Sequence, residues 1–405
     1  MNIVIIGLSA AGLSCLNTLC KISTQAKITA ISAEKYPPYC RCLLTYYLGN
    51  TMTQQELIIT TPTDYPSNVQ FILGQKARQI DPRKKTVRLS HGKELGYDKL
   101  LIAVGADAIK PKYCTEGKRT FTLRYLDDAR KIADAAEGKA VVSGGGFIGI
   151  KTAYGLRQRD IKTDLVITSP YPLAMVLDET SARHIEKDLA EMGIGIITRE
   201  EVTDISQHKN QLKVYLSSGR ELETDVVVVG KGVKPSVDLA QASGIKVNEG
   251  ISVNEYLETS APDIFAAGDC CETMDLARNK VQMMGLWPTA VEQGYFVALN
   301  MAGTRSRYPG SIAMNSLKTK SFHLISAGIL KGEPGLRIYE KNIPSRKQFR
   351  KIAFRGDVPV GMAFYNCPEE AGLFVNLIKK AVPLPANPEK VINGDVSISD
   401  IMKPL

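Results

Sequence analysis

The sequence has few cysteines and no long apolar run, and these two absences narrow the choice of protein class. Only 8 of its 405 residues are cysteine. That is too few for a disulfide-stabilised scaffold, and none form the C-x-x-C pairs typical of zinc or iron–sulfur sites. No apolar run approaches the ~18 residues that a membrane-spanning helix needs, and an apolar strand at the very start leaves no room for a signal peptide. We therefore predict a cytoplasmic protein with no metal site and no membrane insertion.

Histidine is also scarce, and the charge is unbalanced toward basic residues. The 4 histidines are scattered without metal-ligand spacing, and the net charge is +9. Basic residues gather in two stretches, which are typical of solvated surface but also attract acidic partners by long-range steering. Because interleaved aromatic residues and nucleic-acid motifs are missing, we predict an acidic protein partner and no nucleic acid. The two stretches contain Lys110, Lys112, Lys118 and Arg119, and Lys341, Arg346, Lys347, Arg350, Lys351 and Arg355.

A glycine-rich turn stands near the beginning of the chain, in IVIIGLSAAGLSCLNTL. The apolar run 3–6 predicts a buried parallel strand, and the recurring leucines after the turn predict a helix. Gly7, Ser9 and Gly12 follow the pattern G-x-S-x-x-G. Gly7 permits the tight turn, and Gly12 lets the helix pack close to the strand. The helix N-terminus then offers free N–H groups and a positive dipole end to a pyrophosphate.

A second copy of this device, AVVSGGGFIGIKTAYGL, occurs more than a hundred residues later. Gly144, Gly146 and Gly149 give the full G-x-G-x-x-G pattern between a predicted strand, 140–142, and a predicted helix. One such turn could be an ordinary strand–helix connection. Two copies in the same context indicate that one chain binds two dinucleotides.

The residues after each following strand bear on the ribose of each ligand. Strand 26–31 is followed by Glu34, whose carboxylate can accept hydrogen bonds from ribose hydroxyls. Strand 164–167 is followed by residues 168–170, Thr-Ser-Pro. These provide neither a carboxylate that would favour NAD nor an arginine that would favour NADP. The sequence therefore leaves the choice between NADH and NADPH open.

Four further segments carry a family resemblance that spans nearly the whole chain. They are YDKLLIAVGADAIKP (97–111), TDVVVVGKGVKPSVDLA (224–240), TSAPDIFAAGDCCE (259–272) and GLWPTAVEQGYFVALNMAG (285–303). With the two glycine turns, they resemble the flavoprotein reductases of the pyridine nucleotide–disulfide oxidoreductase superfamily. Within it, the chain is most similar to NAD(P)H-dependent rubredoxin and ferredoxin reductases and to the flavin portion of assimilatory nitrite reductase.

The resemblance implies an α/β fold with two Rossmann-like, three-layer dinucleotide-binding domains and a C-terminal α+β domain. The FAD domain is expected to be split between 1–111 and 231–303, with the NAD(P) domain, 112–230, inserted between its halves. Residues 304–405 would form the interface domain, through which the protein could oligomerise. Their pattern predicts strands around a hairpin turn at Arg355-Gly356-Asp357, followed by a helix.

The resemblance also implies the residues that bind the two cofactors, FAD and NAD(H) or NADP(H). Asp269, after Gly268 and before a helix predicted at 290–301, would accept a ribityl hydroxyl proton, and backbone N–H groups near that helix start would face the flavin pyrimidine. The predicted FAD site contains Gly7, Ser9, Ala10, Ala11, Gly12, Glu34, Arg41, Gly105, Gly268, Asp269, Thr289 and Ala290. The predicted NAD(P) site contains Gly144, Gly145, Gly146, Phe147, Ile148, Gly149 and Gly232.

Cys40 and Cys42, in PPYCRCLLTYYLGN, lie on the segment that would run along the flavin. Cys42 matches the single redox cysteine of coenzyme A disulfide reductase and NADH oxidase, but also an inert proline of the rubredoxin reductases, so it is either redox-active or packing material. If the segment is extended, the two side chains point to opposite sides and an internal disulfide is strained. The lysine–glutamate pair of the rubredoxin reductases is replaced here by Tyr46 and Lys151, and Lys151 could stabilise an anionic reduced flavin.

The sequence thus predicts an FAD-dependent NAD(P)H oxidoreductase. It would pass hydride between nicotinamide and flavin, and electrons between flavin and an acidic electron-carrier protein or a catalytic redox subunit. One alternative is a coenzyme A disulfide or polysulfide reductase, or an NADH oxidase, that works through Cys42. Another is a flavin-bearing structural or signalling subunit without useful turnover.

Overall fold

The first of two parallel sheets combines strands from distant parts of the chain. The computed structural model describes residues 1–115, 119–208, 211–384 and 388–394. Lys118 and the last part of the predicted C-terminal domain lie outside these described residues. The first sheet has strand order β19-β7-β1-β2-β3 and is parallel throughout. Its strands are β1 (Asn2–Ile6), β2 (Lys27–Ile31), β3 (Val69–Ile72), β7 (Lys99–Ile102) and β19 (Ile264–Ala266).

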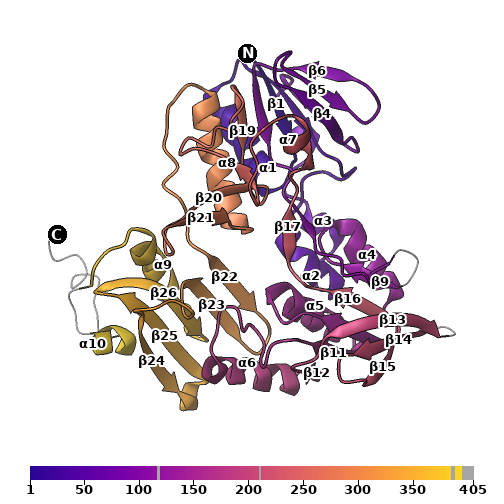
Figure 1. Ribbon diagram of the computed structural model, residues 1–405, viewed down its shortest axis with the longest axis vertical. Helices are drawn as coiled ribbons and strands as arrows, with labels where there is room; N and C mark the ends of the chain where they lie inside the picture. Colours follow the sequence, from indigo (N-terminus) through magenta and orange to yellow (C-terminus); the bar gives the residue numbers. More distant parts are fainter. Residues whose placement is uncertain (116–118, 209–210, 385–387, 395–405) are drawn as a thin grey trace.

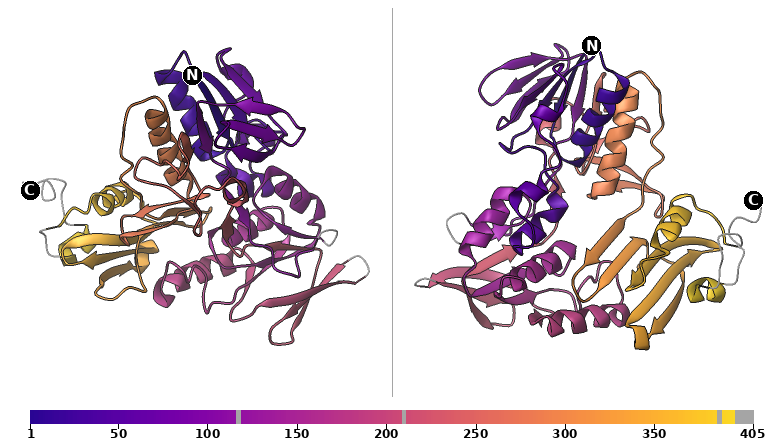
Figure 2. Two further views of the ribbon diagram at one scale, coloured as in Figure 1. Left: turned by 45° about the horizontal axis from the view of Figure 1, so that its top comes forward. Right: turned by 180° about the vertical axis from the view of Figure 1, so that it is seen from behind.

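Two long helices lie side by side against this sheet, α1 (Ala10–Ile22) and α8 (Trp287–Met301) (Figures 1 and 2). Their backbones approach closely because Gly294 faces Ala11. A Cβ at Gly294 would lie 2.1 Å from the Ala11 carbonyl oxygen. Helix α8 begins at Trp287, with Pro288 in its first turn, so it starts earlier than the 290–301 expected. Between Asp269 and this helix the chain forms a hairpin, β20 (Cys271–Asp275) and β21 (Lys280–Met283).

The second parallel sheet has strand order β12-β11-β10-β16-β9. The interior strand β16, between β10 and β9, is Val-Val-Val-Val and buried along its whole length, as expected for a strand covered on both faces. The strands are β9 (Thr120–Thr122), β10 (Lys139–Ser143), β11 (Lys162–Val166), β12 (Ile194–Ile197) and β16 (Val226–Val229). The accompanying helices are α4 (Leu126–Ala135), α5 (Phe147–Arg157) and α6 (Glu179–Glu191).

The chain crosses between the two sheets twice, and the two crossings pair with each other. Strand β8 (Ala106–Ala108) leads out of the first sheet and β17 (Val233–Pro235) leads back, and they form an antiparallel ribbon. The segments 97–111 and 224–240 therefore meet at the junction between the sheets (Figure 1). The predicted α/β class with parallel sheets is confirmed.

A third, antiparallel sheet closes the fold, with order β22-β23-β26-β25-β24. The predicted hairpin is present, since Arg355 pairs with Val358 across the turn. The α5 helix contacts β22, so the second and third sheets meet in the lower half of the molecule in Figure 1. The elements are β22 (Met314–Lys318), β23 (His323–Gly328), β24 (Arg337–Ile343), β25 (Gln348–Arg355), β26 (Val358–Tyr365), α9 (Ala371–Lys379) and α10 (Pro388–Asn393).

Three smaller sheets accompany these three. Two are antiparallel, with the strand orders β4-β5-β6 and β13-β14-β15, and the third joins the hairpin of β20 and β21 to the short strand β18. No helix among the described residues is both long and apolar enough to cross a membrane. The remaining bounds are α2 (Leu44–Leu48), α3 (Gln54–Leu57), α7 (Asp238–Ala242), β4 (Ala77–Asp81), β5 (Thr86–Leu89), β6 (Glu94–Gly96), β13 (Val202–His208), β14 (Gln211–Leu216), β15 (Glu221–Thr224), β18 (Ile251–Ser252), and 3₁₀ turns at Arg41–Leu43, Pro62–Asp64 and Pro344–Arg346.

The second basic stretch is largely neutralised by ion pairs. Lys351 is buried, with 3% of its side chain exposed, and pairs with Asp178 at the start of α6 and with Glu340 of β24. This contact ties the third sheet to the second. Other cations of the stretch also have carboxylate partners, in the pairs Arg350–Glu370, Arg355–Glu333 and Lys347–Glu191.

Candidate functional site

The turn between β1 and α1 requires glycine at two positions. Gly7 has φ +102°, and a Cβ there would lie 2.1 Å from the Ala103 carbonyl oxygen. A Cβ at Gly12 would lie 1.8 Å from the carbonyl oxygen of Gly7 itself. The backbone of α1 therefore packs directly against the turn that follows β1, and this turn packs against residue Ala103 after β7. Ser9 caps α1, and its hydroxyl makes no hydrogen bond to the helix, so the first N–H groups remain available to a ligand.

The turn between β10 and α5 repeats this geometry. Gly144 has φ +134°, and a Cβ at Gly149 would lie 1.9 Å from the Gly144 carbonyl oxygen. Gly146, at the N-cap of α5, faces open space, because no atom lies within 4 Å of a Cβ built there. A bare backbone bordering open space at a helix N-terminus fits a dinucleotide pyrophosphate. Gly145 lies in this turn, and Phe147 and Ile148 are the first two residues of α5.

Other predicted residues of the FAD site meet where β19 ends and α8 begins. Gly268 has φ +83°, and a Cβ there would lie 3.3 Å from the Cβ of Ala11 and 3.7 Å from that of Ala290. The buried Thr289 hydroxyl donates to Ser311 (3.1 Å). The structure therefore brings Ala11, at the start of α1, together with residues more than 250 positions away, and Ala10 lies in the same buried cluster as Ala290. Gly232, φ +92°, lies just before β17.

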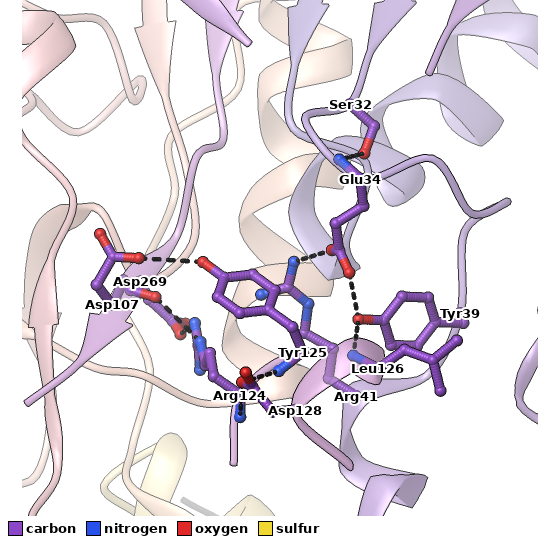
Figure 3. Close-up of polar contacts among 11 residues, drawn as sticks. Ser32, Glu34, Tyr39, Arg41, Asp107, Arg124, Tyr125, Leu126, Asp128 and Asp269 are labelled. Atoms are coloured by element: carbon purple, nitrogen blue, oxygen red, sulfur yellow. Dashed lines mark hydrogen bonds and ion pairs between the residues drawn. The ribbon is translucent and has the colours of Figure 1, made fainter. Parts of the chain in front are cut away.

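An arginine that the sequence reasoning missed lies beside Asp269. Arg124 Nη2 is 2.7 Å from Asp269 Oδ2 (Figure 3). Arg124 Nε donates to the Ala106 carbonyl oxygen at 3.0 Å. Both side chains are mostly buried, at 20% and 14% exposure. A Cβ at Gly105 would lie 3.5 Å from the same guanidinium. The two residues are far apart in sequence, so no local pattern could have paired them.

Glu34 lies in a second polar group. Its carboxylate accepts hydrogen bonds from Arg41 (2.7 Å) and from the hydroxyl of Tyr39 (2.6 Å), which itself accepts from the Leu126 backbone N–H (2.9 Å) (Figure 3). Arg41 also stacks over the ring of Tyr125, 4.7 Å from its centre. Burial raises the pKa of Tyr39, so its hydroxyl stays protonated and donates. Two predicted FAD residues, Glu34 and Arg41, are thus held together and linked to α4.

The segment at the two cysteines is extended only at Cys40, so the condition under which the two side chains would point to opposite sides is not met. Arg41–Leu43 forms a 3₁₀ turn, in which side chains advance about 120° per residue rather than alternating. The neighbouring Cys42 side chain is the main cause that lowers the pKa of Cys40 to about 6. The Cys40 side chain, together with burial, raises the pKa of Cys42.

Lys151 lies near the two cysteines because α2 packs closely against α5. A Cβ at Gly155 would lie 2.6 Å from the Thr45 carbonyl oxygen, so only glycine permits this approach. Lys151, one turn earlier on α5, interacts electrostatically with both cysteines, while burial lowers its own pKa. Tyr46 of α2 lies at the same helix contact, where burial raises its pKa. The structure therefore gathers all three predicted catalytic candidates, Cys42, Tyr46 and Lys151, where α2 meets α5.

Three comparisons place the chain among known proteins. It is 29% identical over 387 residues to the NADH-rubredoxin oxidoreductase of Clostridium acetobutylicum, covering 93% of this chain and 96% of that one. It is 26% identical over 405 residues to the assimilatory nitrate reductase electron transfer subunit of Bacillus subtilis, covering 98% of this chain and 51% of that one. The structure of a covalent putidaredoxin reductase–putidaredoxin complex superposes with a TM-score of 0.90, at 25% identity, covering 99% and 98% of the two chains.

The relatives differ in how much of their length this chain matches. The chain spans about half of the nitrate reductase subunit and less than half of two nitrite reductases that it also matches. The family model described as "Pyridine nucleotide-disulphide oxidoreductase" matches residues 1–294, which contain both glycine turns. This match confirms the resemblance drawn from the sequence. The chain belongs to the pyridine nucleotide-disulphide oxidoreductase family, whose reductases use FAD and NAD(P)H.

Proposed function

We propose that this protein is an FAD-dependent NAD(P)H oxidoreductase that delivers electrons to a protein acceptor. The observation that carries the proposal is the pair of equivalent glycine turns, each joining a parallel strand to a helix N-terminus. In both turns a glycine Cβ would strike the carbonyl oxygen of the first glycine, at 1.8 Å and 1.9 Å. Such a turn presents backbone N–H groups to a pyrophosphate, and two of them suit two dinucleotides.

FAD is assigned to the first turn. Gly7, Gly12 and the start of α1 would hold the pyrophosphate, and Glu34 would accept hydrogen bonds from the adenosine ribose. Asp269 would bind a ribityl hydroxyl, and the guanidinium of Arg124, which now neutralises Asp269, would stand beside the phosphates. When bound, FAD accepts hydride from a nicotinamide and releases electrons to an acceptor.

NAD(P)H is assigned to the second turn, with Gly144, Gly146, Gly149 and Gly232 providing close backbone approach. The predicted domain limits follow this assignment: 1–111 and 231–303 for FAD, 112–230 for NAD(P), and 304–405 for the C-terminal domain. The protein's own residues orient the dinucleotides and exclude water at the junction formed by β8 and β17.

The proposed acceptor is a small electron-carrier protein or a catalytic redox subunit. The support is similarity to a rubredoxin reductase, to an electron transfer subunit and to a reductase solved with its carrier protein. The net charge of +9 favours an acidic partner. Because carboxylates neutralise much of the second basic stretch, that attraction would come from the overall field rather than from this stretch.

Anaerobic rapid mixing tests the proposal. The purified protein should contain about one FAD per chain, and NADH or NADPH should bleach the flavin absorbance within the turnover time of a reductase. Rubredoxin and ferredoxin are then compared as acceptors. A protein that neither retains nor takes up flavin would refute the proposal, and flavin reduction far slower than turnover would favour the structural or signalling subunit.

A further inference from the structure

The loop that follows β11 is anchored to the second glycine turn. The Leu173 N–H donates to the Gly145 carbonyl oxygen at 2.8 Å. Ile167, the first residue after β11, is buried beneath the turn, since a Cβ at Gly145 would lie 2.8 Å from its Cγ2 atom. In a dinucleotide-binding fold, residues after the second strand lie beside the adenosine ribose, where a carboxylate hydrogen-bonds the 2′-hydroxyl of NAD. Residues 167–176 contain no carboxylate, so the loop cannot bind that hydroxyl in this way.

An arginine is brought to this loop by the next strand of the sheet. Strand β12 runs parallel to β11 (Figure 1), so both strands end at the same edge. Beyond that edge, the Arg199 N–H donates to the Ser169 carbonyl oxygen at 3.2 Å. The Glu200 N–H donates to the Ile167 carbonyl oxygen at 3.0 Å. These contacts hold the backbone of Arg199 beside the place that the ribose 2′-oxygen would occupy.

The Arg199 side chain is available to an anion. It is exposed, and none of the carboxylates that the structure describes forms an ion pair with it. The two carboxylates that follow it in the chain have other partners. Glu200 accepts a hydrogen bond from the Ser217 hydroxyl at 2.7 Å, and Glu201 pairs with Lys231 at 3.4 Å.

A second cation borders the same loop. Lys331 follows β23 of the third sheet, and its ammonium lies 5.7 Å from the centre of the Tyr171 ring. The Ser169 hydroxyl donates to the Tyr171 carbonyl oxygen at 2.8 Å, which ties this tyrosine to the residue that Arg199 contacts. Two basic side chains from different sheets therefore border a loop that has no acidic residue.

We propose that the second dinucleotide site selects NADPH over NADH, with the Arg199 guanidinium binding the 2′-phosphate of the adenosine ribose and Lys331 adding a second positive charge. This preference rests on the proposed function, because it concerns the dinucleotide assigned to the second turn. A guanidinium binds phosphate through charge-assisted and often bidentate hydrogen bonds. NADH has only a hydroxyl at this position, and the loop provides no carboxylate to accept its hydrogen bond. Residues 168–170 left the choice open because the arginine follows β12 rather than β11.

Nucleotide fragments test the preference without flavin reduction or turnover. Equilibrium binding to the full-length protein, at ~0.15 M salt, compares adenosine 2′,5′-bisphosphate with adenosine 5′-monophosphate. The wild type should bind the bisphosphate at least about tenfold more tightly. R199E should weaken bisphosphate binding by about 10- to 100-fold and change monophosphate binding by less than about twofold. R199G, which suits the φ of +57° at this position, should also lose about tenfold or more. R199E/K331E should prefer the monophosphate.

R78E is the matched control. Arg78 is exposed on β4, and its replacement changes the net charge by as much as R199E does, so R78E reports the effect of the overall positive field alone. It should leave the ratio of the two affinities unchanged. Equal affinities in the wild type, or equal losses in R78E and R199E, would overturn the proposal. Equal affinities together with rapid flavin reduction by NADH would do so while the proposed function stands. A bisphosphate preference in a protein whose flavin NADPH cannot reduce would support the phosphate site and refute the proposed function.

Discussion

Replacing Gly12 or Gly149 by alanine should remove one dinucleotide at a time. In each variant the new Cβ would lie less than 2 Å from a backbone carbonyl oxygen, 1.8 Å from Gly7 or 1.9 Å from Gly144. Ordinary carbon–oxygen contact is nearer 3.4 Å, so the turn must open by roughly 1.5 Å. Because the obstacle is backbone, no side-chain rotation can relieve it.

The expected cost follows from packing and from lost ligand contacts. Overpacking of this kind costs about 1–3 kcal/mol, and alanine regains up to about 1 kcal/mol through helix propensity. An opened turn also misdirects N–H groups, and each hydrogen bond to a charged phosphate contributes about 1.5–3 kcal/mol. Since 1.4 kcal/mol is tenfold in affinity, binding of the affected dinucleotide should weaken by about 10- to 100-fold.

The assay measures both ligands in both variants. G12A should bind FAD about 10- to 100-fold more weakly but keep its affinity for an NAD(P)H analogue, whereas G149A should retain FAD and bind the NAD(P)H analogue about 10- to 100-fold more weakly. G372A is the control, because a Cβ at Gly372 in α9 meets nothing within 4 Å and should leave both affinities unchanged. If G12A kept FAD at wild-type affinity, or if G149A lost FAD instead, the assignment of the two turns would be wrong.

Further predictions concern the ion pairs of Lys351 and the reactivity of the Cys40 thiol. K351M should change the free energy of unfolding by less than about 1 kcal/mol, because the carboxylates of Asp178 and Glu340 reach solvent. The double variant D178N/E340Q leaves a buried cation unpaired and should lower the free energy of unfolding by about 3 kcal/mol more than K351M does. Equal urea denaturation midpoints for the two variants would contradict this. The ion pair lowers the pKa of Asp178, so its stabilisation is present above the ordinary aspartate range and is lost as the pH falls through the folded value. Alkylation of Cys40 should be half-maximal near pH 6 and level above it, because the pKa is lowered to about 6 and the thiolate is the reactive form; a profile parallel to that of Cys114 would refute this.

The parallel strands and both glycine turns were readable from the sequence because their signals are local. Short apolar runs predict buried parallel strands, and a glycine pattern of six residues describes a turn whose contacts lie within that window. Strand β10 and the turn after it appear where the sequence predicts them, and the hairpin at Arg355–Asp357 is equally local.

The chemistry between these elements was decided only by the tertiary structure. Arg124 and Asp269 are 145 positions apart, and Lys351 reaches Asp178 across 173, so no window of sequence could pair them. The two cysteines are close in sequence, yet their orientation also needed the fold. Contacts of Cys40 with Leu57 and of Arg41 with Glu34 hold that segment in a turn, where its composition alone allowed a strand. The local sequence determined where the strands, turns and helices form. Contacts between residues far apart in the sequence determined which side chains lie next to one another.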